Sequence, residues 1–322
     1  LSLGVGTLGE NEVIKGACIE LKGDFNVGSQ TGEFFPYNFG PELPADQILD
    51  DEKSTCFDTD FNDEALSIVG TPILNITLSV KKPLAQLAVR LCDVRPDGTS
   101  ALITHGFRNL TMVKSFEHPK KLILGERIDV EIELDQTAYN IPIGHKLRLA
   151  ISSTYWPFIW PSPEVTKINI YGGTLSLPFI DDKDQQDEES FDPPISGEPR
   201  KYNIKRPPSS TRRSFFDEGI EQQVLEVKHD SGCVVDLEHG LETDSAVIER
   251  WFSTNGDPLS AKIDIKWYQI IKRDTWDVYI ESEFNVVCDH DYFYLNGIVT
   301  AYENSKKVFL RNFNEKVFRD FV

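Results

Sequence analysis

The chain has 322 residues, of which 40% are hydrophobic and 11% are aromatic, a composition typical of a folded globular protein. This length favours two domains, each large enough to bury a core without disulfides or metals. No stretch approaches the ~18 uninterrupted apolar residues of a membrane span, and a net charge of −19 opposes binding to nucleic acid or to anionic membranes. We therefore expect neither nucleic acid nor a membrane as a partner.

The cysteines and the start of the chain indicate a cellular location. The chain begins with Leu1, its only methionine is Met112, and its opening lacks the basic and then apolar pattern of a secretory signal. It is therefore predicted to be cut from a longer precursor. The cysteines are odd in number and form no C-x-x-C pair, so we expect reduced thiols and a cytoplasmic protein. They are Cys18, Cys56, Cys92, Cys233 and Cys288.

The string from Gly4 to Gly9 matches the G-x-G-x-x-G phosphate-binding pattern, and Asp24 lies near the spacing expected of a ribose-binding acid. This motif binds phosphates only between a strand and a helix, and no amphipathic helix clearly follows it here. We interpret the string as a glycine-rich loop and expect no cofactor.

A dense acidic group precedes the first clear strand. Carboxylate oxygens are the ligands that calcium prefers, but the spacing here lacks the regular pattern of a calcium loop. We favour carboxylates that cap turns or face a neighbouring domain, with a bound cation as the alternative. The group consists of Asp46, Asp50, Asp51, Ser54 and Asp58.

Between residues 48 and 180, apolar residues fall at every second position in short runs, which is the period of half-buried strands. Turn signals such as Arg95-Pro96-Asp97-Gly98 separate the runs, and no helix of useful length fits between them. The pattern predicts an all-β antiparallel sandwich or jelly roll. The predicted buried residues are Leu74, Ile76, Leu78, Val80, Leu87, Val89, Leu91, Ile128, Val130, Ile132, Leu134, Leu147, Leu149, Ile151, Ile168, Ile170, Leu175 and Leu177.

Bulky aromatic residues alternate with prolines between Tyr155 and Pro161. The prolines exclude a regular central strand over this string. Three interpretations stay open: one end of the sandwich core, an interface to another domain, or a platform on which a sugar stacks.

Residues 181–215 are predicted to form an acidic and proline-rich linker. The stretch from Asp181 to Glu198 holds eight acidic residues and one lysine, and the stretch from Arg206 to Arg213 is too polar and too rich in proline to bury a core. We favour a solvated connection over a docking role for these charges.

Alternation resumes after Phe215 and predicts a second, smaller antiparallel β domain over residues 216–322. The last two strands are predicted over 292–302 and 307–313. Turns are predicted at 272–274, at 289–291 and at Asn304-Ser305, and His229-Asp230-Ser231 is also interpreted as a turn.

No motif with the spacing of a catalytic or metal site is found. The G-x-S-x-G nucleophile elbow is absent. His229-Asp230-Ser231 contains the three residue types of a hydrolytic triad, but consecutive residues on an extended backbone point to opposite faces and cannot converge. The six histidines include no pair at helical i, i+4 spacing and no Cys/His cluster, so zinc is not expected.

Four strings together resemble the C-terminal part of the CocE/NonD hydrolases, which include cocaine esterase and the X-Pro dipeptidyl-peptidases. Members of that family have an α/β-hydrolase domain with a Ser-His-Asp triad, a helical cap and then a non-catalytic, galactose-binding-like β-sandwich. The resemblance covers residues 44–180, and the part from about 216 onward is similar to an added β domain of larger members. The strings are Pro44-Ala45-Asp46-Gln47 with Asp50-Asp51 and Ser54 to Asp58; Leu87 to Gly98; Gly144 to Leu149; and Ser152 to Pro157 with Trp160 to Pro163.

The resemblance implies that the catalytic triad lies in an α/β-hydrolase domain that this sequence does not contain, and that residues 1–47 lead in from it. The chain itself is then a non-catalytic module that packs against the catalytic domain of an acyl esterase or X-Pro dipeptidyl-peptidase. Arg90 and Asp93 are expected to form a buried ion pair that fixes the 96–98 turn. The predicted interface residues are Asp46, Asp50, Asp51, Asp58, Tyr155, Trp156 and Trp160.

Two other classes of function stay open at this stage. One is a free-standing carbohydrate-binding module, which exposed planar rings at Trp156, Trp160 and Trp251 would favour. The other is an enzyme with an unfamiliar site. The sequence also leaves homo-oligomerisation open.

Overall fold

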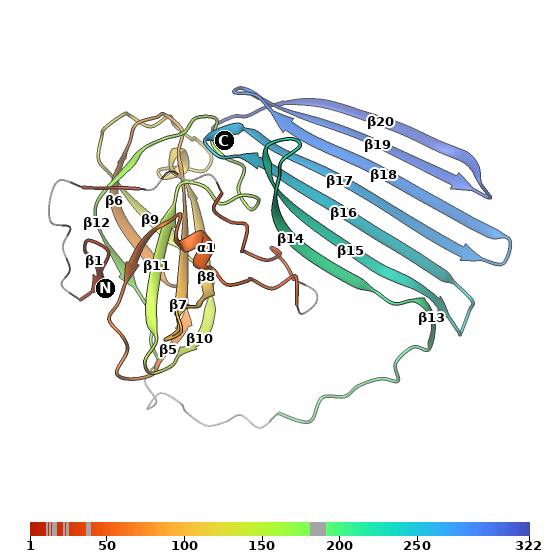
Figure 1. Ribbon diagram of the computed structural model, residues 1–322, viewed down its shortest axis with the longest axis horizontal. Helices are drawn as coiled ribbons and strands as arrows, with labels where there is room; N and C mark the ends of the chain where they lie inside the picture. The colour runs from red at the N-terminus through yellow and green to blue at the C-terminus, as the bar shows by residue number, and fades with distance from the viewer. Residues whose placement is uncertain are drawn as a thin grey trace. The chain divides into compact units, whose positions relative to one another are not determined.

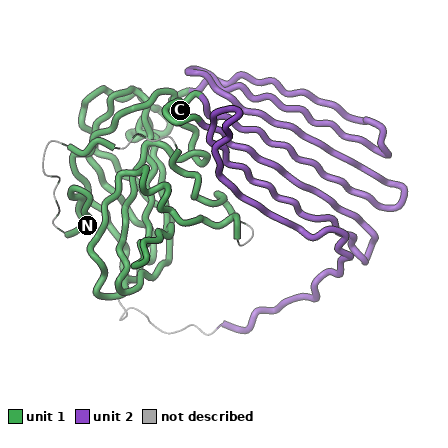
Figure 2. The backbone as a smooth tube through the Cα atoms, viewed as in Figure 1, with its two compact units in different colours: residues 1–186, 254–259, 320–322 green, residues 187–253, 260–319 purple. Residues whose placement is uncertain are grey.

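The structure is a computed structural model, and it describes residues 1–10, 12, 14, 18–21, 23, 26–36, 40–180 and 191–322. The chain forms two compact units, shown in green and purple in Figure 2. Unit 1 comprises residues 1–186, 254–259 and 320–322, and unit 2 comprises residues 187–253 and 260–319. Asp24 and the acidic residues from 181 to 190 lie outside the described residues.

Unit 1 consists of antiparallel strands with almost no helix (Figure 1), which confirms the predicted all-β class. The first sheet has the order β2-β1-β12-β6-β9, with β3 also on β12; the second has the order β4-β11-β7-β8; and β10 pairs with β5. The elements are β1 Ser2–Leu3, β2 Leu8–Gly9, β3 Ile19–Glu20, α1 Ile48–Asp51, β4 Thr55–Asp58, β5 Leu66–Gly70, β6 Ile73–Val80, β7 Gln86–Val94, β8 Ser100–Asn109, the 3-10 turn Leu110–Met112, β9 Ile128–Glu133, β10 Thr137–Ile141, β11 Lys146–Ser152 and β12 Ile168–Ser176.

The core of unit 1 lies between its first two sheets. One cluster of buried side chains contains Leu78 and Ile132 from the first sheet and Leu91 and Leu149 from the second. All the residues predicted to be buried are in this core except Ile128 and Leu177, which are partly buried and pack against it. The alternation therefore identified the buried face of each strand, because successive side chains of a strand point to opposite faces. Among the described residues, no helix is long and apolar enough to cross a bilayer.

Strand β7 is the most enclosed element of the chain, because all nine of its residues are buried. Leu87, Val89 and Leu91 enter the core, so Ala88 and Arg90 point to the other face of the sheet. That second face is covered by the segment that contains α1, as the hydrogen bonds described below show. Arg90, buried on this second face, is the residue around which the candidate site is built.

The glycine string near the N-terminus forms the turn of a short hairpin. Strands β1 and β2 pair with each other, and the amide of Gly4 donates to the carbonyl oxygen of Thr7. β1 and β3 both add to β12, so part of the expected lead-in belongs to the first sheet. No helix follows the string in the described residues, which agrees with the interpretation as a loop.

Unit 2 contains a single eight-stranded antiparallel sheet with the order β13-β15-β16-β17-β18-β19-β20, with β14 also on β15 (Figure 1). The predicted turns at 289–291 and at Asn304-Ser305 are confirmed. Asn304 and Ser305 have φ values of 47° and 64°, as a two-residue hairpin turn of type I′ requires. The strands are β13 Tyr202–Arg206, β14 Ser209–Asp217, β15 Gln222–Asp236, β16 Glu242–Thr254, β17 Asp257–Arg273, β18 Trp276–Cys288, β19 Tyr292–Glu303 and β20 Lys306–Phe318.

Three expectations about local structure in unit 2 were wrong. The turn predicted at 272–274 lies at Asp274-Thr275, and Lys272 and Arg273 belong to β17. Residues 202–206 and 209–215, placed in a linker by composition, lie in β13 and β14. His229-Asp230-Ser231, interpreted as a turn, lies inside β15, where the pairing shifts between Asp230 and Cys233. Gly232 has a φ of 78°, and a Cβ there would lie 2.5 Å from the carbonyl oxygen of Arg206, so this bulge needs glycine.

The unit 2 sheet has one apolar face and one polar face. Side chains directly opposite each other in antiparallel strands share a face, and the register places Ile265, Phe284, Gly297 and Phe313 in one row. The rows on either side continue this apolar face. Its apolar members are Ile263, Ile265, Trp267, Val278, Ile280, Phe284, Val286, Leu295, Val299, Phe309 and Phe313. Two charges of the edge strand, Arg311 and Glu315, lie on the same face, opposite Val299 and Leu295. The other face carries Asp264, Lys266, Glu281, Glu283, Asn285, Asn296, Asn312 and Asn314, together with Ile298 and Leu310.

A carboxylate on the polar face is held by three cations. Glu226 accepts hydrogen bonds from Arg213 and Arg250 at 2.9 and 2.8 Å, and the Lys228 ammonium lies 3.2 Å away. Burial alone would raise the pKa of Glu226, but the hydrogen bonds from these cations lower it to about 2. Arg213 therefore holds β14, the supposed linker, against the neighbouring β15.

Candidate interface site

The acidic group of the sequence surrounds a buried arginine. Arg90 on β7 is 1% exposed, and its guanidinium lies 2.9 Å from the carboxylate of Asp51. It also donates to Oε1 of Gln47 at 3.1 Å and to Oγ of Ser54 at 2.9 Å. Three side chains from the segment around α1 therefore bind the one guanidinium group on the sheet. We call Arg90, Gln47, Asp51 and Ser54 the Arg90 network.

Asp50 ties a preceding loop to the same place. Its carboxylate accepts hydrogen bonds from the backbone amides of Gly28 at 3.0 Å and of Gln30 at 3.2 Å. Burial raises the pKa of Asp50, although the charge of Arg90 and these two hydrogen bonds oppose the shift. Asp50 thus fixes the chain around residue 28 over the second face of β7.

A second arginine links the network to the edge of the sheet. Arg148 on β11 makes two hydrogen bonds of 2.7 Å to the carboxylate of Asp58 and one of 3.1 Å to Asp51. Asp46 instead accepts from the amides of Ile48 and Ser100, so it caps a turn as one interpretation expected. The acidic group therefore faces arginines and amides of its own unit.

The expected ion pair between Arg90 and Asp93 does not form. These residues are three apart on one strand, so their side chains point to opposite faces of the sheet. Asp93 instead accepts a hydrogen bond from the hydroxyl of Tyr139 at 2.9 Å and contacts Nδ1 of His145 at 2.8 Å. Both charged groups are buried and have partners, but these come from other parts of the chain: Asp51 of α1 for Arg90, and Tyr139 and His145 for Asp93.

The aromatic string begins in a buried position and ends nearer the surface. Tyr155 is fully buried and Trp156 is 6% exposed, whereas Trp160 is half-buried. The indole rings of Trp156 and Trp160 meet edge to face with centroids 5.0 Å apart. The amide of Trp156 donates to the carbonyl oxygen of Val27, so the string packs on the loop that Asp50 holds. The structure therefore brings Asp50 and the aromatic string to one region.

Four rings form what we call the aromatic cluster: His105, Phe107, Tyr155 and Phe158. Their centroids are 4.9 to 6.2 Å apart in every contacting pair. Phe34 stands at the edge of the cluster, with its ring 5.7 Å from that of Phe158. Strand β8 supplies His105 and Phe107, and the aromatic string supplies the other two rings.

The exposed part of this region was missed by sequence reasoning. Phe34 is 79% exposed and the adjacent Phe35 is 69% exposed, although both are large and apolar. They lie between Glu33 and Glu42, whose backbones are joined by a hydrogen bond of 2.8 Å. Two neighbouring exposed phenylalanines beside a buried cluster form a candidate contact surface. We call Phe34, Phe35 and Phe158 the aromatic rim.

The histidine of the cluster gives unit 1 a pH dependence. Burial lowers the pKa of His105 from its ordinary value of 6.5, and the Asp135 carboxylate, 3.6 Å away, opposes this shift. The unfolded chain therefore binds a proton at a higher pH than the folded chain does. The contribution of His105 to the free energy of unfolding is therefore fully present above pH 6.5. It is lost as the pH falls from 6.5 through the pKa of the folded state.

We expect the free energy of unfolding to fall over that window with a slope of at most about 1.4 kcal/mol per pH unit from this group. His105→Phe removes the titrating ring but keeps an aromatic side chain, so its slope should be smaller than that of the wild type. Urea titrations at a series of pH values measure both slopes. Equal slopes in the two proteins would show that His105 titrates freely in the folded state.

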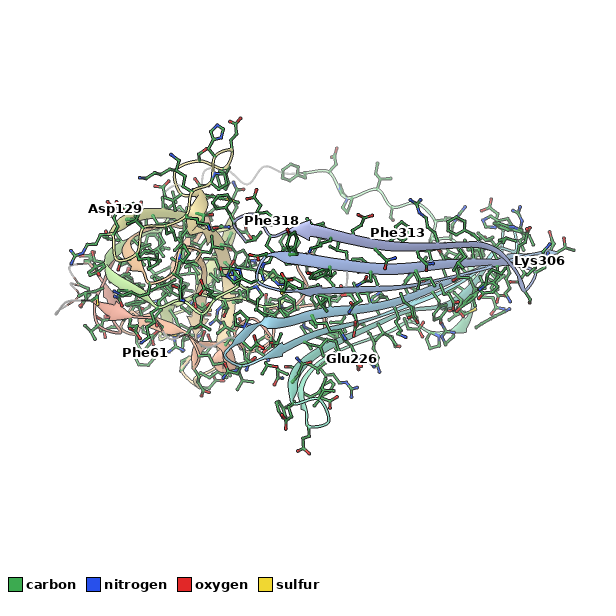
Figure 3. The ribbon with its side chains drawn as sticks, turned by 90° about the horizontal axis from the view of Figure 1, so that it is seen from above. Phe61, Asp129, Glu226, Lys306, Phe313 and Phe318 are labelled. Carbon is green, nitrogen blue, oxygen red and sulfur yellow. The ribbon has the colours of Figure 1, made fainter. Side chains whose placement is uncertain are left out.

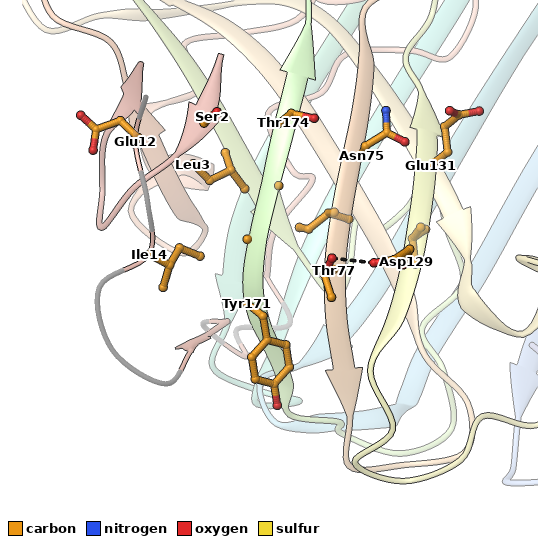
Figure 4. Close-up of a pocket in the computed structure, with 14 residues that line it drawn as sticks. Ser2, Leu3, Glu12, Ile14, Asn75, Thr77, Asp129, Glu131, Tyr171 and Thr174 are labelled. Atoms are coloured by element: carbon orange, nitrogen blue, oxygen red, sulfur yellow. Dashed lines mark hydrogen bonds between the residues drawn. The ribbon is translucent and has the colours of Figure 1, made fainter. Parts of the chain in front are cut away.

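A hollow of about 720 Å³ lies on the first sheet, with lining residues from β1, β6, β9 and β12 (Figure 4). Thr77 donates a hydrogen bond of 2.6 Å to Asp129 within it. The guanidinium of Arg127 lies over one face of the Tyr171 ring, 3.8 Å from its centroid, so that face is not free for stacking. The lining contains carboxylates and amides but neither histidine nor cysteine.

Among the described residues, no group of three or more His, Cys, Asp or Glu side chains is placed to hold a metal ion. The carboxylate oxygens of the acidic group face Arg90, Arg148 and backbone amides. They are therefore not arranged around a common point where the cation of the alternative interpretation could bind. His229 and Asp230 lie side by side on β15 and therefore point to opposite faces.

The chain matches the family described as the X-Pro dipeptidyl-peptidase C-terminal non-catalytic domain over residues 19–191. It is 24% identical to cocaine esterase of Rhodococcus sp. (strain MB1 Bresler), over 38% of this chain and 21% of that protein. It is 28% identical to the Xaa-Pro dipeptidyl-peptidase of Lactobacillus delbrueckii subsp. lactis, over 27% of this chain and 15% of that protein. The chain thus spans about a fifth of these relatives or less.

Two solved structures are similar in part. An α-amino acid ester hydrolase gives a TM-score of 0.44 at 17% identity, over 52% of this chain and 33% of that one. A CocE/NonD family hydrolase from Staphylococcus aureus gives a TM-score of 0.40 at 14% identity, over 56% of this chain and 36% of that one. Because the family match covers more than half of the 322 residues, the chain belongs to the X-Pro dipeptidyl-peptidase C-terminal non-catalytic domain family, a part of CocE/NonD and X-Pro peptidase hydrolases.

Proposed function

We propose that this chain is the non-catalytic C-terminal region of an α/β-hydrolase-type serine hydrolase, and that unit 1 packs against the catalytic domain and supports it. The parent enzyme would cleave acyl esters or X-Pro peptides. The observation that carries the proposal is the aromatic rim, where Phe34 and Phe35 are 79% and 69% exposed beside the aromatic cluster. Interfaces bury such aromatic anchors at their centres.

Asp50, next to the Arg90 network in the chain, supports this function by holding the loop that leads to the rim. Asp50 is buried and binds the amides of Gly28 and Gln30, a few residues before Phe34. Asp50 and Asp51 use their carboxylates inside the unit, so of the predicted acidic residues only Asp46 and Asp58 keep exposed or half-exposed positions. We infer that acidic residues position the surface and that aromatic residues make the contact.

The proposal also includes a jelly-roll, galactose-binding-like topology for unit 1 and a cytoplasmic location. Support for the location is that all five cysteines are free, including the buried Cys92 and Cys233. The alternative of a carbohydrate-binding module depends on exposed rings at three tryptophans, and their exposure does not favour it. Trp156 is buried and Trp160 and Trp251 are half-buried, whereas sugar platforms present exposed rings.

The test is association with a separately produced catalytic domain of the same protein. We expect the double variant Phe34→Ser/Phe35→Ser to weaken binding by about tenfold or more, since the loss of an aromatic anchor costs more than about 1.4 kcal/mol. Titration calorimetry measures the affinity. Phe116→Ser is a matched control, because Phe116 is 71% exposed but packs under Arg108 instead of the aromatic cluster. Equal affinity of the double variant and the wild type would refute the proposed contact.

A further inference from the structure

Strand β20 is the outermost strand of the unit 2 sheet. It pairs with β19 along one side, and no described strand pairs with its other side (Figure 1). All thirteen of its residues are exposed. A long edge strand presents a row of unpaired N–H and C=O groups that can accept another strand.

The protection of this edge is partial. β20 contains no proline, and its pairing with β19 shifts only at Ala301/Tyr302, next to the hairpin turn. Its five charged side chains are of both signs: Lys306, Lys307, Arg311, Glu315 and Lys316. Proteins usually block an open edge with proline, a bulge or inward-pointing charges. Near the middle of β20, however, Phe309 is 47% exposed, Leu310 is 51% exposed and Phe313 is 37% exposed. Figure 3 shows Lys306, Phe313 and Phe318 along the strand. An open edge of this length with exposed apolar side chains is a pairing site or an aggregation site.

The sequence of β20 is complementary to itself in one antiparallel register. If two copies pair about a twofold axis at Phe313, Arg311 of each copy lies opposite Glu315 of the other. Phe313 then lies opposite Phe313, Phe309 opposite Val317, and Asn312 opposite Asn314. Opposite charges and aromatic pairs placed directly across an antiparallel ladder stabilise it.

Other registers lack this match. An axis perpendicular to the sheet keeps the apolar face continuous only when it passes through a residue, because paired residues must share a face. An axis at Arg311 places that arginine opposite itself, and an axis at Asn312 places Phe309 opposite Glu315. An axis at Asn314 places Phe313 opposite Glu315. Of these four axes, only the one at Phe313 places Arg311 opposite Glu315 and Phe313 opposite Phe313.

We propose that two copies of this chain associate through β20, antiparallel and with Phe313 on the twofold axis, so that their unit 2 sheets form one continuous sheet. The apolar face then continues across the axis, with Arg311 and Glu315 closing the junction on either side of the paired phenylalanines. Such an interface is isologous and closed. It covers the β20 edge of each of the two copies, and pairing through β20 therefore cannot grow into a fibre.

Charge reversal tests this register. Sedimentation velocity of the full 322-residue chain over a wide range of concentrations should show a dimer for the wild type. Arg311→Glu and Glu315→Arg each place two pairs of like charges across the axis, so each should raise the dimer dissociation constant by about tenfold or more. The double variant R311E/E315R restores both pairs and should return the constant to near the wild-type value.

Lys266→Glu is the matched control, because Lys266 forms an exposed cross-strand ion pair with Glu283 on the polar face, away from the edge. It should leave the dimer unchanged, and circular dichroism checks that every variant keeps its β structure. A wild-type chain that stays monomeric at all concentrations would overturn the proposal. So would a dimer that tolerates both single reversals, or a double variant that fails to recover.

Discussion

Replacing Arg90 by methionine should lower the free energy of unfolding of unit 1 by about 3–5 kcal/mol, the range observed when one partner of a buried ion pair is removed. The methionine fills much of the space but leaves the Asp51 carboxylate, 1% exposed, without its closest cation. Gln47 Oε1 and Ser54 Oγ also lose their donor. Because domains are stable by only about 5–15 kcal/mol, a large part of the stability would be lost.

A urea titration followed by circular dichroism measures this loss. Lys82→Met is the control, since Lys82 and Glu164 form an ion pair of 2.6 Å whose side chains are 43% and 36% exposed. The loss of such a surface pair should lower the free energy of unfolding by less than about 1 kcal/mol. Adding Asp51→Asn to Arg90→Met should recover part of the loss, because it removes a buried charge that has lost its closer cation and keeps only Arg148. Similar losses for Arg90→Met and Lys82→Met would mean that the network contributes no more than a surface pair.

The strands of unit 1 could be predicted because one face of each is buried. Alternation identified the inward residues of β6, β7, β9, β11 and β12, since a one-residue slip would have turned leucines and isoleucines to solvent. The same local rule could not find the partner of Arg90. Asp51 is far away in sequence, and only the fold brings it to the second face of β7. The two-residue period did contain the information that Arg90 and Asp93 cannot meet.

Composition misled where strands are polar. The stretch from Arg206 to Arg213 has prolines and few apolar residues, yet β14 forms because its backbone pairs with β15 and Arg213 binds Glu226. An edge strand needs little burial of its own when its hydrogen bonds and ion pairs are supplied by a neighbour. Phe34 and Phe35 were missed for the opposite reason, because two isolated apolar residues in a loop have no period that a pattern could detect.

The tightest point of the candidate site is Gly28, which lies between Asp50 and the aromatic string. Its amide donates to Asp50, and its φ of 113° is a conformation that side chains rarely allow. A Cβ at this position would lie 2.5 Å from the carbonyl oxygen of Trp156 and 2.9 Å from the carbonyl carbon of Tyr155. Both obstacles are backbone atoms, so no side chain can rotate to make room.

We therefore expect Gly28→Ala to destabilise unit 1 by about 2–5 kcal/mol, through overpacking together with a disallowed backbone angle. Gly98→Ala is the matched control, because its φ is 90° but no heavy atom lies within 4 Å of a Cβ there. Gly98→Ala should lower the free energy of unfolding only by the cost of its unfavourable backbone angle, about 1–2 kcal/mol. Urea titrations of both variants give the difference. If that difference is zero, the Gly28 loop moves freely over Trp156, and the aromatic rim is not held by the buried acidic residues beneath it.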